Sequence, residues 1–388
     1  MKIVHVITRL ILGGAQENTL LTVDGLHHTF GDDVTLITGP AEGPEGDLFT
    51  RARERGLKVE IMPELIRAIR PSTDYRAYRL LRSSIRRLAP EVVHTHSSKA
   101  GILGRAAAWD EHVPAIVHTI HGLPFGPSES PAKNRLYIAL EKWAARRCHS
   151  IVGVCDAMAE QALAEGVGRP EQYTTVYSGM DVDAFLHPRR ARDEVRRELA
   201  LADDEVAFGT VARLFERKGH DDILLAAPEV LRANPKVRFV FIGDGILRDK
   251  LIADTERLGI RHAFHFTGLV LPDRIPELLN ALDGVVHPSL REGLARVLPQ
   301  SLLVGRPVIS YDIDGAREVV LPETGILLPP RSIEGLKAAI LRLAADPTLR
   351  DAMGQEGRAR FSDRFRQETM TAQLRSLYER LLARPSTG

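Results

Sequence analysis

The segment HPSLREGLARVLPQSLLVGRPVI, which runs from His287 to Ile309, contains the pattern that decides the fold. A β-branched strand ends at its first residues, the loop LREG follows, and the next strand opens at RPVI. The helix between them is expected to begin near Leu294, because Pro299 is tolerated only within the first turns of a helix. Continuous apolar strands joined by a helix are typical of a parallel sheet buried on both faces.

The same alternation of short apolar runs and helical patterns extends along the whole chain. The first half contains the runs KIVHVIT, DVTLITG, KVEIM, EVVHTHS, AIVHTIHG, SIVGVC and TTVYSG. The second half contains the runs EVAFGTVAR, VRFVFIGDG, HAFHFTG, DGVVHPS, RPVISYD and GILLPP. Between them lie segments with helical spacing of apolar residues, such as KNRLYIALEKWAARR and GLKAAILRLAAD. The sequence therefore predicts two doubly wound α/β domains.

A boundary between the two domains is expected near residues 181–204. This segment is charged, contains Pro188 and precedes a new strand, which is typical of a linker with a short helix. We assign residues 1–182 to the first domain and residues 183–365 to the second. An amphipathic helix at about 366–388 is expected to return and pack on the first domain.

Composition and charge exclude several classes of protein. The 388 residues are 44% hydrophobic and 27% charged, an ordinary balance for a soluble protein. Because 52 basic residues oppose 51 acidic ones, net charge gives no support for a nucleic-acid partner. The N-terminal residues lack a signal-peptide pattern, and no apolar run is long enough to cross a bilayer. We expect a cytoplasmic protein in which Cys148 and Cys155 are reduced and buried.

Polar residues at strand ends are the first candidates for a site, because open parallel sheets bind ligands at the carboxyl ends of their strands. Gly13 and Gly14 follow the first strand and open a helix, where backbone N–H groups can approach a phosphate. A plain tight turn is an equal alternative. Ser98 and Lys99 open another helix and favour an anion, whereas a helix cap by Ser97 or Ser98 is the competing interpretation.

The second domain offers a cationic pair at the end of its first strand. Arg213 and Lys218 lie in VARLFERKG, where a fork-shaped and a compact cation suit a diphosphate. A solvated pair is the competing interpretation. Asp244, between two glycines at the end of the next strand, either contacts a ligand or shapes its loop.

The opening segment adds a carboxylate and an amide. Glu292 lies in the loop and can accept hydrogen bonds from sugar hydroxyls, and Gln300 can both donate and accept. His121 follows a strand of the first domain and can donate a hydrogen bond or polarise a leaving group. Histidines inside strands are better interpreted as core residues; these are His94, His96 and His118.

Several motifs, in one order, resemble those of family 4 glycosyltransferases, which are retaining enzymes of the GT-B fold. The motifs are LGGAQ, VARLFERKGHDDILLAA, FIGDGILRDKL, FTGLVLPDRIPELLNALDGVVHPS and REGLARVLPQSLLVGRPVI. The resemblance covers nearly the whole chain. It implies two Rossmann-like domains that face a central cleft, with a nucleotide diphosphate sugar, UDP-sugar first among them, on the second domain. It also implies a sugar or lipid-linked acceptor on the first domain.

The resemblance assigns roles to individual residues. Arg213 and Lys218 would hold the donor diphosphate, Gly14 would approach it, Glu292 would bind the donor sugar, and His121 would lie near the reacting centre. The remaining substrate-binding candidates are Gly13, Ser98, Lys99, Asp244, Gly293, Leu294, Gln300, Gly315 and Ala316. The acceptor would attack from the face that the leaving group departs from, and the departing phosphate oxygen would take its proton.

Gln300 departs from the family pattern, which has a second glutamate at this position to hold the ribose. An amide still binds hydroxyls but loses charge assistance of about 1 kcal/mol, so we expect a weaker ribose contact.

No cofactor and no metal are expected. Two Asp-x-Asp triplets, Asp181 to Asp183 and Asp312 to Asp314, resemble metal-binding pairs of other glycosyltransferases, but chance accounts for them in a chain with 51 acidic residues. No His and Cys pattern of a zinc site occurs. Two alternatives to transfer are a nucleotide-sugar epimerase of the same architecture and a non-catalytic nucleotide-sugar-binding protein.

An arginine-rich segment at residues 67–87 carries seven arginines. Its apolar stripe predicts a helix that packs on a core, and its other face suits anionic lipid headgroups or an acceptor phosphate. This would give peripheral contact with the inner face of a membrane. A solvated basic face is the alternative.

Overall fold

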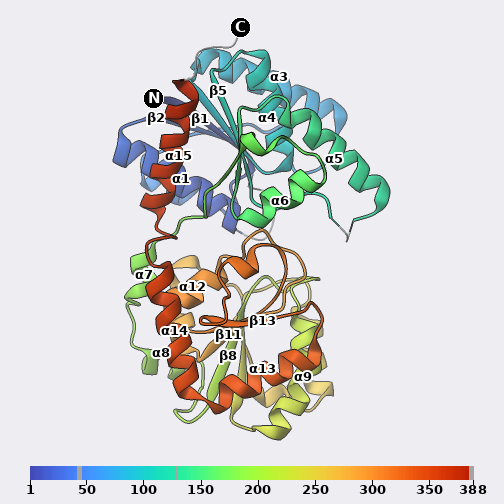
Figure 1. Ribbon diagram of the computed structural model, residues 1–388, viewed down its shortest axis with the longest axis vertical. Coiled ribbons are helices and arrows are strands. Elements are labelled where there is room, and N and C mark those ends of the chain that lie inside the picture. Colours follow the sequence, from blue (N-terminus) through green and yellow to red (C-terminus); the bar gives the residue numbers. More distant parts are fainter. Residues whose placement is uncertain (42–45, 127–128, 384–388) are drawn as a thin grey trace. The chain divides into compact units, whose positions relative to one another are not determined.

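The computed structural model describes residues 1–41, 46–126 and 129–383. The chain forms two compact units, of which the first comprises Met1–Met180 with Phe365–Gly388 and the second comprises Asp181–Arg364. In each unit a parallel β-sheet lies between layers of helices (Figure 1). This confirms the predicted fold class of two doubly wound α/β domains.

The sheet of the first unit has seven parallel strands in the order β3-β2-β1-β4-β5-β6-β7. They are β1 (Lys2–Arg9), β2 (Asp33–Gly39), β3 (Lys58–Ile61), β4 (Val92–His96), β5 (Ala115–Ile120), β6 (Ser150–Gly153) and β7 (Tyr173–Thr175). The chain builds outward from β1 to β3 and then resumes at β4 on the other side of β1. The carboxyl ends of β1 and β4 therefore flank the point where the strand order reverses, which is where such sheets bind ligands.

Helices cover both faces of this first sheet. They are α1 (Gly14–Phe30), α2 (Phe49–Glu54), α3 (Pro71–Leu88), α4 (Ser98–Asp110), α5 (Pro131–Ala145), α6 (Asp156–Ala164), the 3-10 turn η1 (Pro170–Gln172) and α15 (Gln367–Leu382). The C-terminal helix α15 lies beside α1 in Figure 1, and the two helices contact each other. Met370, Leu374 and Tyr378 of α15 are buried in one core with Ile3 and Val23. Residues 384–388 of the predicted C-terminal segment lie outside the described residues.

The sheet of the second unit has six parallel strands in the order β10-β9-β8-β11-β12-β13. They are β8 (Val206–Val211), β9 (Val237–Ile242), β10 (Phe264–Phe266), β11 (Gly284–His287), β12 (Val308–Tyr311) and β13 (Gly325–Leu328). The order reverses between β8 and β11. All thirteen strands of both sheets coincide with the apolar runs read from the sequence.

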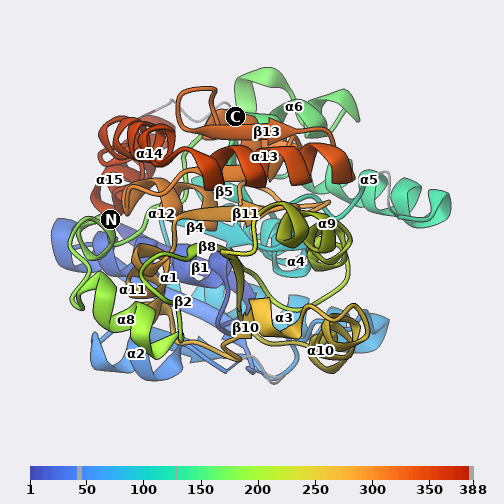
Figure 2. The same ribbon diagram turned by 90° about the horizontal axis from the view of Figure 1, so that it is seen from below.

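The helices of the second unit include two short ones in the predicted linker. The full set is α7 (Val182–Leu186), α8 (Arg192–Glu198), α9 (His220–Ala233), α10 (Arg248–Arg257), α11 (Ile275–Ala281), α12 (Val297–Leu303), α13 (Ile333–Ala345), α14 (Pro347–Phe361), η2 (Arg261–Ala263), η3 (Pro272–Arg274) and η4 (Asp314–Glu318). Helices α9 and α13 lie side by side (Figures 1 and 2) and bury Ile223 and Ile340 against Phe208, Phe239 and Phe241 of the sheet.

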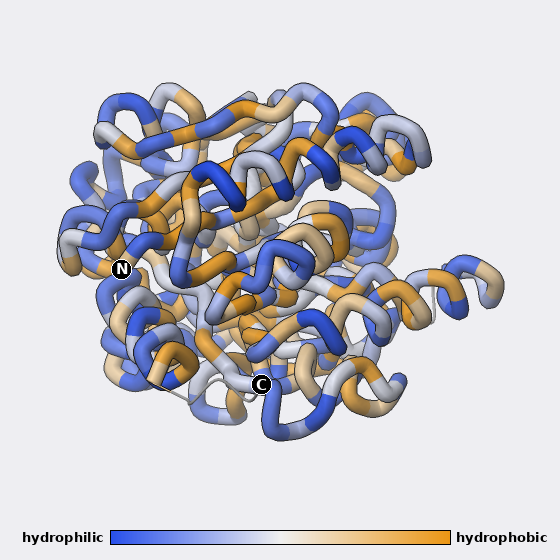
Figure 3. Tube along the Cα trace, turned by 90° about the horizontal axis from the view of Figure 1, so that it is seen from above, coloured by the Kyte–Doolittle hydropathy of each residue, from blue (hydrophilic) through white to orange (hydrophobic). Residues whose placement is uncertain are grey.

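Surface helices show hydrophilic and hydrophobic residues in alternation along the trace (Figure 3). Such helices bury one stripe and expose the other, which is how short helices gain stability from a sheet. Helix α12 begins at Val297, three residues later than the start expected near Leu294. Glu292 and Gly293, which precede these residues, are hydrogen-bonded to the loop after β12, as described below. Pro299 lies in the first turn, as expected.

Candidate active site

Two loops at the carboxyl ends of β8 and β11 pack directly against each other in the second unit. The N–H of Leu290 donates to the carbonyl oxygen of Arg217 at 2.8 Å. Gly219 lies at a φ of 77°, and a Cβ there would stand 2.0 Å from the carbonyl oxygen of Pro288. Glycine is therefore required for this approach. The contact places Lys218 opposite the loop that carries Glu292.

Lys218 and Glu292, both predicted site residues, form an ion pair. The Lys218 Nζ donates to Glu292 Oε1 at 2.5 Å, and His287 Nε2 lies 3.3 Å from the same oxygen. The side chains of Lys218 and Glu292 are 23% and 19% exposed. The pair is therefore withdrawn from bulk water but still reachable by a ligand.

The carboxyl group of Glu292 is ionised at neutral pH. Burial by itself would raise the pKa of Glu292, but the close polar contact with His287 and the positive charge of Lys218 outweigh burial and lower the pKa to about 2. An ionised carboxylate accepts hydrogen bonds and cannot donate one. Glu292 is thus suited to holding hydroxyl groups.

The loop after β12 fixes the backbone around Glu292. The N–H of Glu292 donates to Asp314 Oδ2 at 2.7 Å, and the N–H of Gly315 donates to the carbonyl oxygen of Gly293 at 3.0 Å. Leu294 and Ala316 are buried beside these contacts. The four predicted positions from Gly293 to Ala316 therefore belong to one hydrogen-bonded pair of loops.

Arg213 and Asp244 lie on neighbouring loops at the ends of β8 and β9. Arg213 is exposed, and its guanidinium lies over the ring of Phe215, 5.0 Å from the centroid. The N–H of Leu214 donates to the carbonyl oxygen of Asp244 at 2.9 Å, so the backbone of Asp244 shapes the loop that carries Arg213. Gln300 is partly exposed on α12, and in the described part of the chain its side chain makes no hydrogen bond.

Two histidines of this region were missed by the sequence analysis. His287 is the last residue of β11 and touches Glu292; its position at a strand end was the signal that could have found it. His220 is the first residue of α9 and is buried against Phe241, at 4.9 Å between ring centroids. Burial lowers the pKa of His220 to about 4, so it is neutral at pH 7.

In the first unit the glycine pair stands where a phosphate could approach. Helix α1 begins at Gly14, directly after the loop that leaves β1, and Gly14 is exposed. Gly13 has extended backbone, but a Cβ there would lie 2.7 Å from Gln16 Oε1. Because this atom is the free end of a flexible side chain, a larger residue at position 13 would require only that Gln16 move.

Ser98 and Lys99 open α4, but the side chain of Lys99 turns away to α3. Its Nζ donates to Asp74 Oδ1 at 2.5 Å and to the carbonyl oxygen of Ala68. The expected cap by Ser97 is not formed: Ser97 Oγ instead lies 2.8 Å from Thr8 Oγ1 on β1. Ser98 is partly exposed at the start of the helix.

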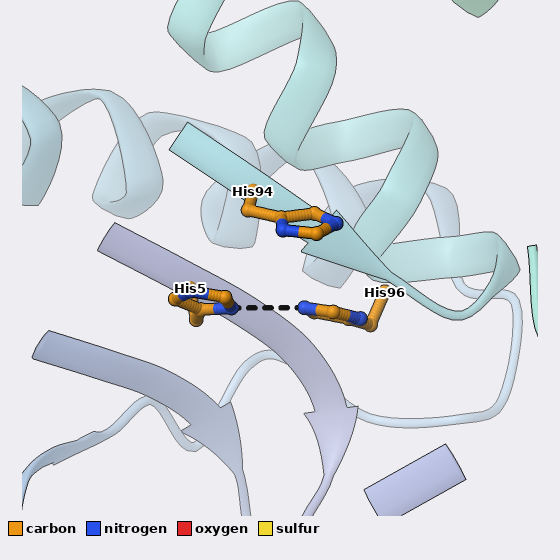
Figure 4. Close-up of side chains that lie close together, drawn as sticks. All are labelled: His5, His94 and His96. Atoms are coloured by element: carbon orange, nitrogen blue, oxygen red, sulfur yellow. Dashed lines mark hydrogen bonds between the residues drawn. The ribbon is translucent and has the colours of Figure 1, made fainter. Parts of the chain in front are cut away.

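His121, just after β5, contacts a group of buried histidines on β1 and β4. His121 Nε2 lies 3.1 Å from His96 Nδ1, and His96 Nε2 lies 2.9 Å from His5 Nδ1 (Figure 4). His94 stacks on His96 with 4.4 Å between centroids. His94, His96 and His118 are buried, as their interpretation as core residues requires.

The histidine cluster is the place where a metal ion would be sought first. His5, His94 and His96 each offer a nitrogen, and these atoms lie within 4.8 Å of one another. Both nitrogens of His94 are engaged, however: Nδ1 lies 2.5 Å from the Tyr378 hydroxyl and Nε2 lies 2.7 Å from the Thr119 hydroxyl. The cluster is accounted for as a hydrogen-bonded network.

The two Asp-x-Asp triplets have structural partners. Asp181 caps α7 by accepting from the N–H of Ala184, and Asp312 forms an ion pair with Arg317 at 2.9 Å. Asp314 accepts from the backbone of Glu292, as described above.

The comparisons with known proteins agree with this architecture. The family model described as Glycosyl transferases group 1 matches residues 191–360, and the model described as Glycosyl transferase 4-like domain matches residues 13–179. The UDP-Gal:alpha-D-GlcNAc-diphosphoundecaprenol alpha-1,3-galactosyltransferase of Escherichia coli is 28% identical over 354 residues, which are 90% of this chain and 89% of that protein.

Two solved structures share the fold. HepE of Anabaena, in complex with UDP-glucose, has a TM-score of 0.81 at 21% identity and covers 98% of this chain and 100% of its own. Sucrose-phosphate synthase from Thermosynechococcus elongatus has a TM-score of 0.82 at 20% identity and covers 98% and 99%. These findings confirm the family and fold predicted from the motifs. With one model on each unit, the chain belongs to the group 1, family 4-like glycosyltransferases, retaining enzymes of the GT-B fold.

Proposed function

We propose that this glycosyltransferase moves a sugar from a nucleotide diphosphate sugar, specifically a UDP-sugar, to a hydroxyl group of a polysaccharide or lipid-linked precursor. The observation that carries the proposal is the Lys218–Glu292 pair at the strand ends of the second unit. One relative is named for a UDP-Gal donor and a diphosphoundecaprenol-linked acceptor, and HepE was solved with UDP-glucose. Both names support the choice of UDP.

The cations supply the stabilisation that the leaving group needs. Transfer breaks the bond between sugar C1 and the β-phosphate oxygen, so negative charge grows on the departing diphosphate. Lys218 and Arg213 precede α9, whose N-terminal N–H groups also favour an anion. Fixed positive charge aimed at a developing anion is usually the largest contribution to such catalysis.

Glu292 holds and orients the donor sugar. Its pKa of about 2 keeps the carboxylate charged, so it accepts hydrogen bonds from sugar hydroxyls and is not the acid of the reaction. The acceptor hydroxyl then forms a new bond to C1 on the face that the diphosphate leaves. Its proton passes to the departing phosphate oxygen, so no protein base is required.

The other candidate residues take supporting roles. Gln300 contacts the ribose hydroxyls through its amide, and Asp244 with the loops around Gly293 and Gly315 shapes the donor site. In the first unit Gly13, Gly14 and Ser98 belong to the substrate-binding surface, and His121 serves the reacting sugar. Lys99 is held by Asp74, so it acts on substrate only if that ion pair opens.

We further propose peripheral membrane contact through the segment 67–87. Arg82 and Arg86 share the single carboxylate of Glu111, which offsets one of their two positive charges, and Arg87 is paired with Glu60. The exposed cations that form no ion pair among the described residues are Arg67, Arg70, Arg76 and Arg79. Exposed apolar side chains stand beside them, with Ile69 67% and Tyr75 60% exposed. Among the described residues, no helix is both long enough and apolar enough to cross a bilayer.

The test is direct assay of the purified full chain. UDP-, GDP-, ADP- and dTDP-sugars are incubated with a diphosphoundecaprenol-linked acceptor, and nucleoside diphosphate release and product are measured. We expect transfer from a UDP-sugar with retained anomeric configuration. Lys218→Met should reduce turnover about 100-fold or more, whereas the exposed, paired Lys250→Met serves as its control. Failure of every UDP-sugar to bind would overturn the choice of donor.

Membrane contact is tested separately. Vesicles with anionic lipid should sediment the protein at low salt, and the double variant Arg70→Glu with Arg76→Glu should lose this binding. Equal sedimentation of both proteins would remove the segment from the proposal.

A further inference from the structure

We propose that His96 and His5 are positioning residues that fix which nitrogen of His121 carries its proton. The inference rests on the proposed function only in assigning His121 to the reacting sugar. The hydrogen-bonded chain His121, His96, His5 is called the histidine relay below.

The histidine relay is a continuous line of ring nitrogens that crosses three strands. It begins at His121 just after β5, continues to His96 at the end of β4 and ends at His5 within β1. The two links are 3.1 Å and 2.9 Å between nitrogens. Figure 4 shows the edge of the His5 ring directed at the edge of the His96 ring, with His94 stacked alongside.

The inner members of the histidine relay are neutral at pH 7. Burial lowers the pKa of His5 to about 3. Burial and the neighbouring histidines hold the pKa of His96 well below its ordinary value. A neutral imidazole has one N–H donor and one acceptor nitrogen. Each hydrogen bond of the histidine relay therefore points from an N–H donor to an acceptor nitrogen. Because a neutral ring that accepts at one nitrogen must donate from the other, the direction of one hydrogen bond sets that of the next.

The far end of the histidine relay selects the direction. His5 Nε2 is buried and has no hydrogen-bond partner among the described residues. If the links point from His121 toward His5, the unpartnered Nε2 must carry an N–H. If they point from His5 toward His121, that nitrogen is only an unused acceptor. In proteins, a buried N–H donor without a partner is rarer than a buried acceptor without one. The direction from His5 toward His121 is therefore favoured.

The favoured direction determines the state of His121. His5 Nδ1–H donates to His96 Nε2, and His96 Nδ1–H donates to His121 Nε2. Because His121 accepts at Nε2, a neutral His121 carries its proton on Nδ1. Its N–H donor is thus presented at one edge of the ring only. For a residue that serves the reacting sugar, this fixes where a hydrogen bond can be donated.

The neighbouring groups leave this chain intact. His94 is bonded to Tyr378 on α15 and to Thr119 on β5, so neither of its nitrogens competes for His96. His118 lies next to Thr119 and bonds Thr95, 2.9 Å away. His118 is buried like His96 but takes no part in the histidine relay, which makes it a matched control.

Nitrogen NMR of the ¹⁵N-histidine-labelled full chain tests the proposal without substrate. We expect His5, His96 and His121 each to show the signature of a proton on Nδ1, with signals assigned by single substitutions. In His96→Leu we expect the proton of His121 to move to Nε2. Asparagine retains a donor near the position of Nδ1, so His96→Asn should restore the original signature. A wild-type His121 with its proton on Nε2 overturns the proposal, whether or not any sugar is transferred.

Kinetics then test the positioning role. His96→Leu should lower kcat on the order of 10-fold or more with little change in donor KM, and His96→Asn should recover most of the loss. His118→Asn should keep both values near those of the unsubstituted protein. If His96→Leu matches His118→Asn in kcat, the histidine relay is structural and the proposal fails. If no transfer occurs with any protein, the proposed function fails while the NMR result still decides the proton position.

Discussion

Acidification should unfold the first unit well before ordinary carboxylate titration does. Burial lowers the pKa of His5 to about 3 and holds the pKa values of His94, His96 and His118 well below the ordinary value of 6.5. These rings bind no proton in the folded chain near pH 5.5, whereas they do in the unfolded chain. The contribution of these histidines to stability is therefore complete above about pH 7.5 and falls as the pH decreases through 6.5.

The magnitude follows from the shift of a single histidine. For His5, a folded pKa of about 3 against 6.5 when unfolded removes about 1.4 kcal/mol between about pH 7.5 and 5.5. Four such residues together would remove on the order of 5 kcal/mol, which is a large part of the stability of an ordinary domain. The positive charge of Arg105 lowers the pKa of His118 further, in addition to burial. Tyr378, which faces His94, stays neutral because burial raises its pKa.

Hydrogen exchange measured by mass spectrometry resolves the two units separately. After correction for intrinsic exchange, the free energy of opening measured for peptides from β1 and β4 should fall by about 5 kcal/mol between about pH 7.5 and pH 5.5. His5→Gln should reduce the pH dependence by about 1.4 kcal/mol, whereas His112→Gln, an exposed residue of the same unit, should not change it. Equal protection at both pH values would refute the assignment of neutral buried histidines.

Further predictions concern the second unit and the chemistry. Glu292→Gln should lower kcat/KM on the order of 100-fold while UDP still binds, because Lys218 is released from its ion pair and can contact the diphosphate. The exposed Glu334→Gln is the control, and weaker UDP binding by Glu292→Gln would contradict the release of Lys218. Gly219→Ala should destabilise the second unit by about 1 to 3 kcal/mol in urea titration, since a Cβ would meet a carbonyl oxygen at 2.0 Å; an unchanged midpoint would refute this. Gln300→Glu should tighten UDP binding about 5-fold in calorimetry, and a collapse of activity with donor binding unchanged would contradict the ribose contact. Transfer should continue in the presence of a chelator, and strict loss of activity would instead indicate a required metal.

The strands of both units could be predicted from the sequence because most of them are short apolar runs rich in β-branched or aromatic residues and bounded by turn residues. The start of α12 was predicted three residues too early, and the hydrogen bond from the N–H of Glu292 to Asp314, twenty-two residues away in sequence, could not be predicted at all. Local propensity contains no information about that contact.

The candidate site was predictable where a motif supplied it, as for Lys218 and Glu292. Side-chain contacts between strands could not be predicted, because they depend on the order of the strands in the sheet. Ser97 bonds Thr8 instead of capping α4, since β1 lies beside β4. For the same reason His5, which looks like any core residue in KIVHVIT, meets His96.

The position of α15 has a consequence for synthesis and for truncation. Its side chains complete the core around Ile3 and Val23, although about 180 residues of the other unit are made in between. Because α15 follows the whole second unit in sequence, the core of the first unit stays incomplete during synthesis until α15 has been made. A truncation that removes α15 would therefore destabilise the first unit, whereas the core of the second unit would keep all of its side chains.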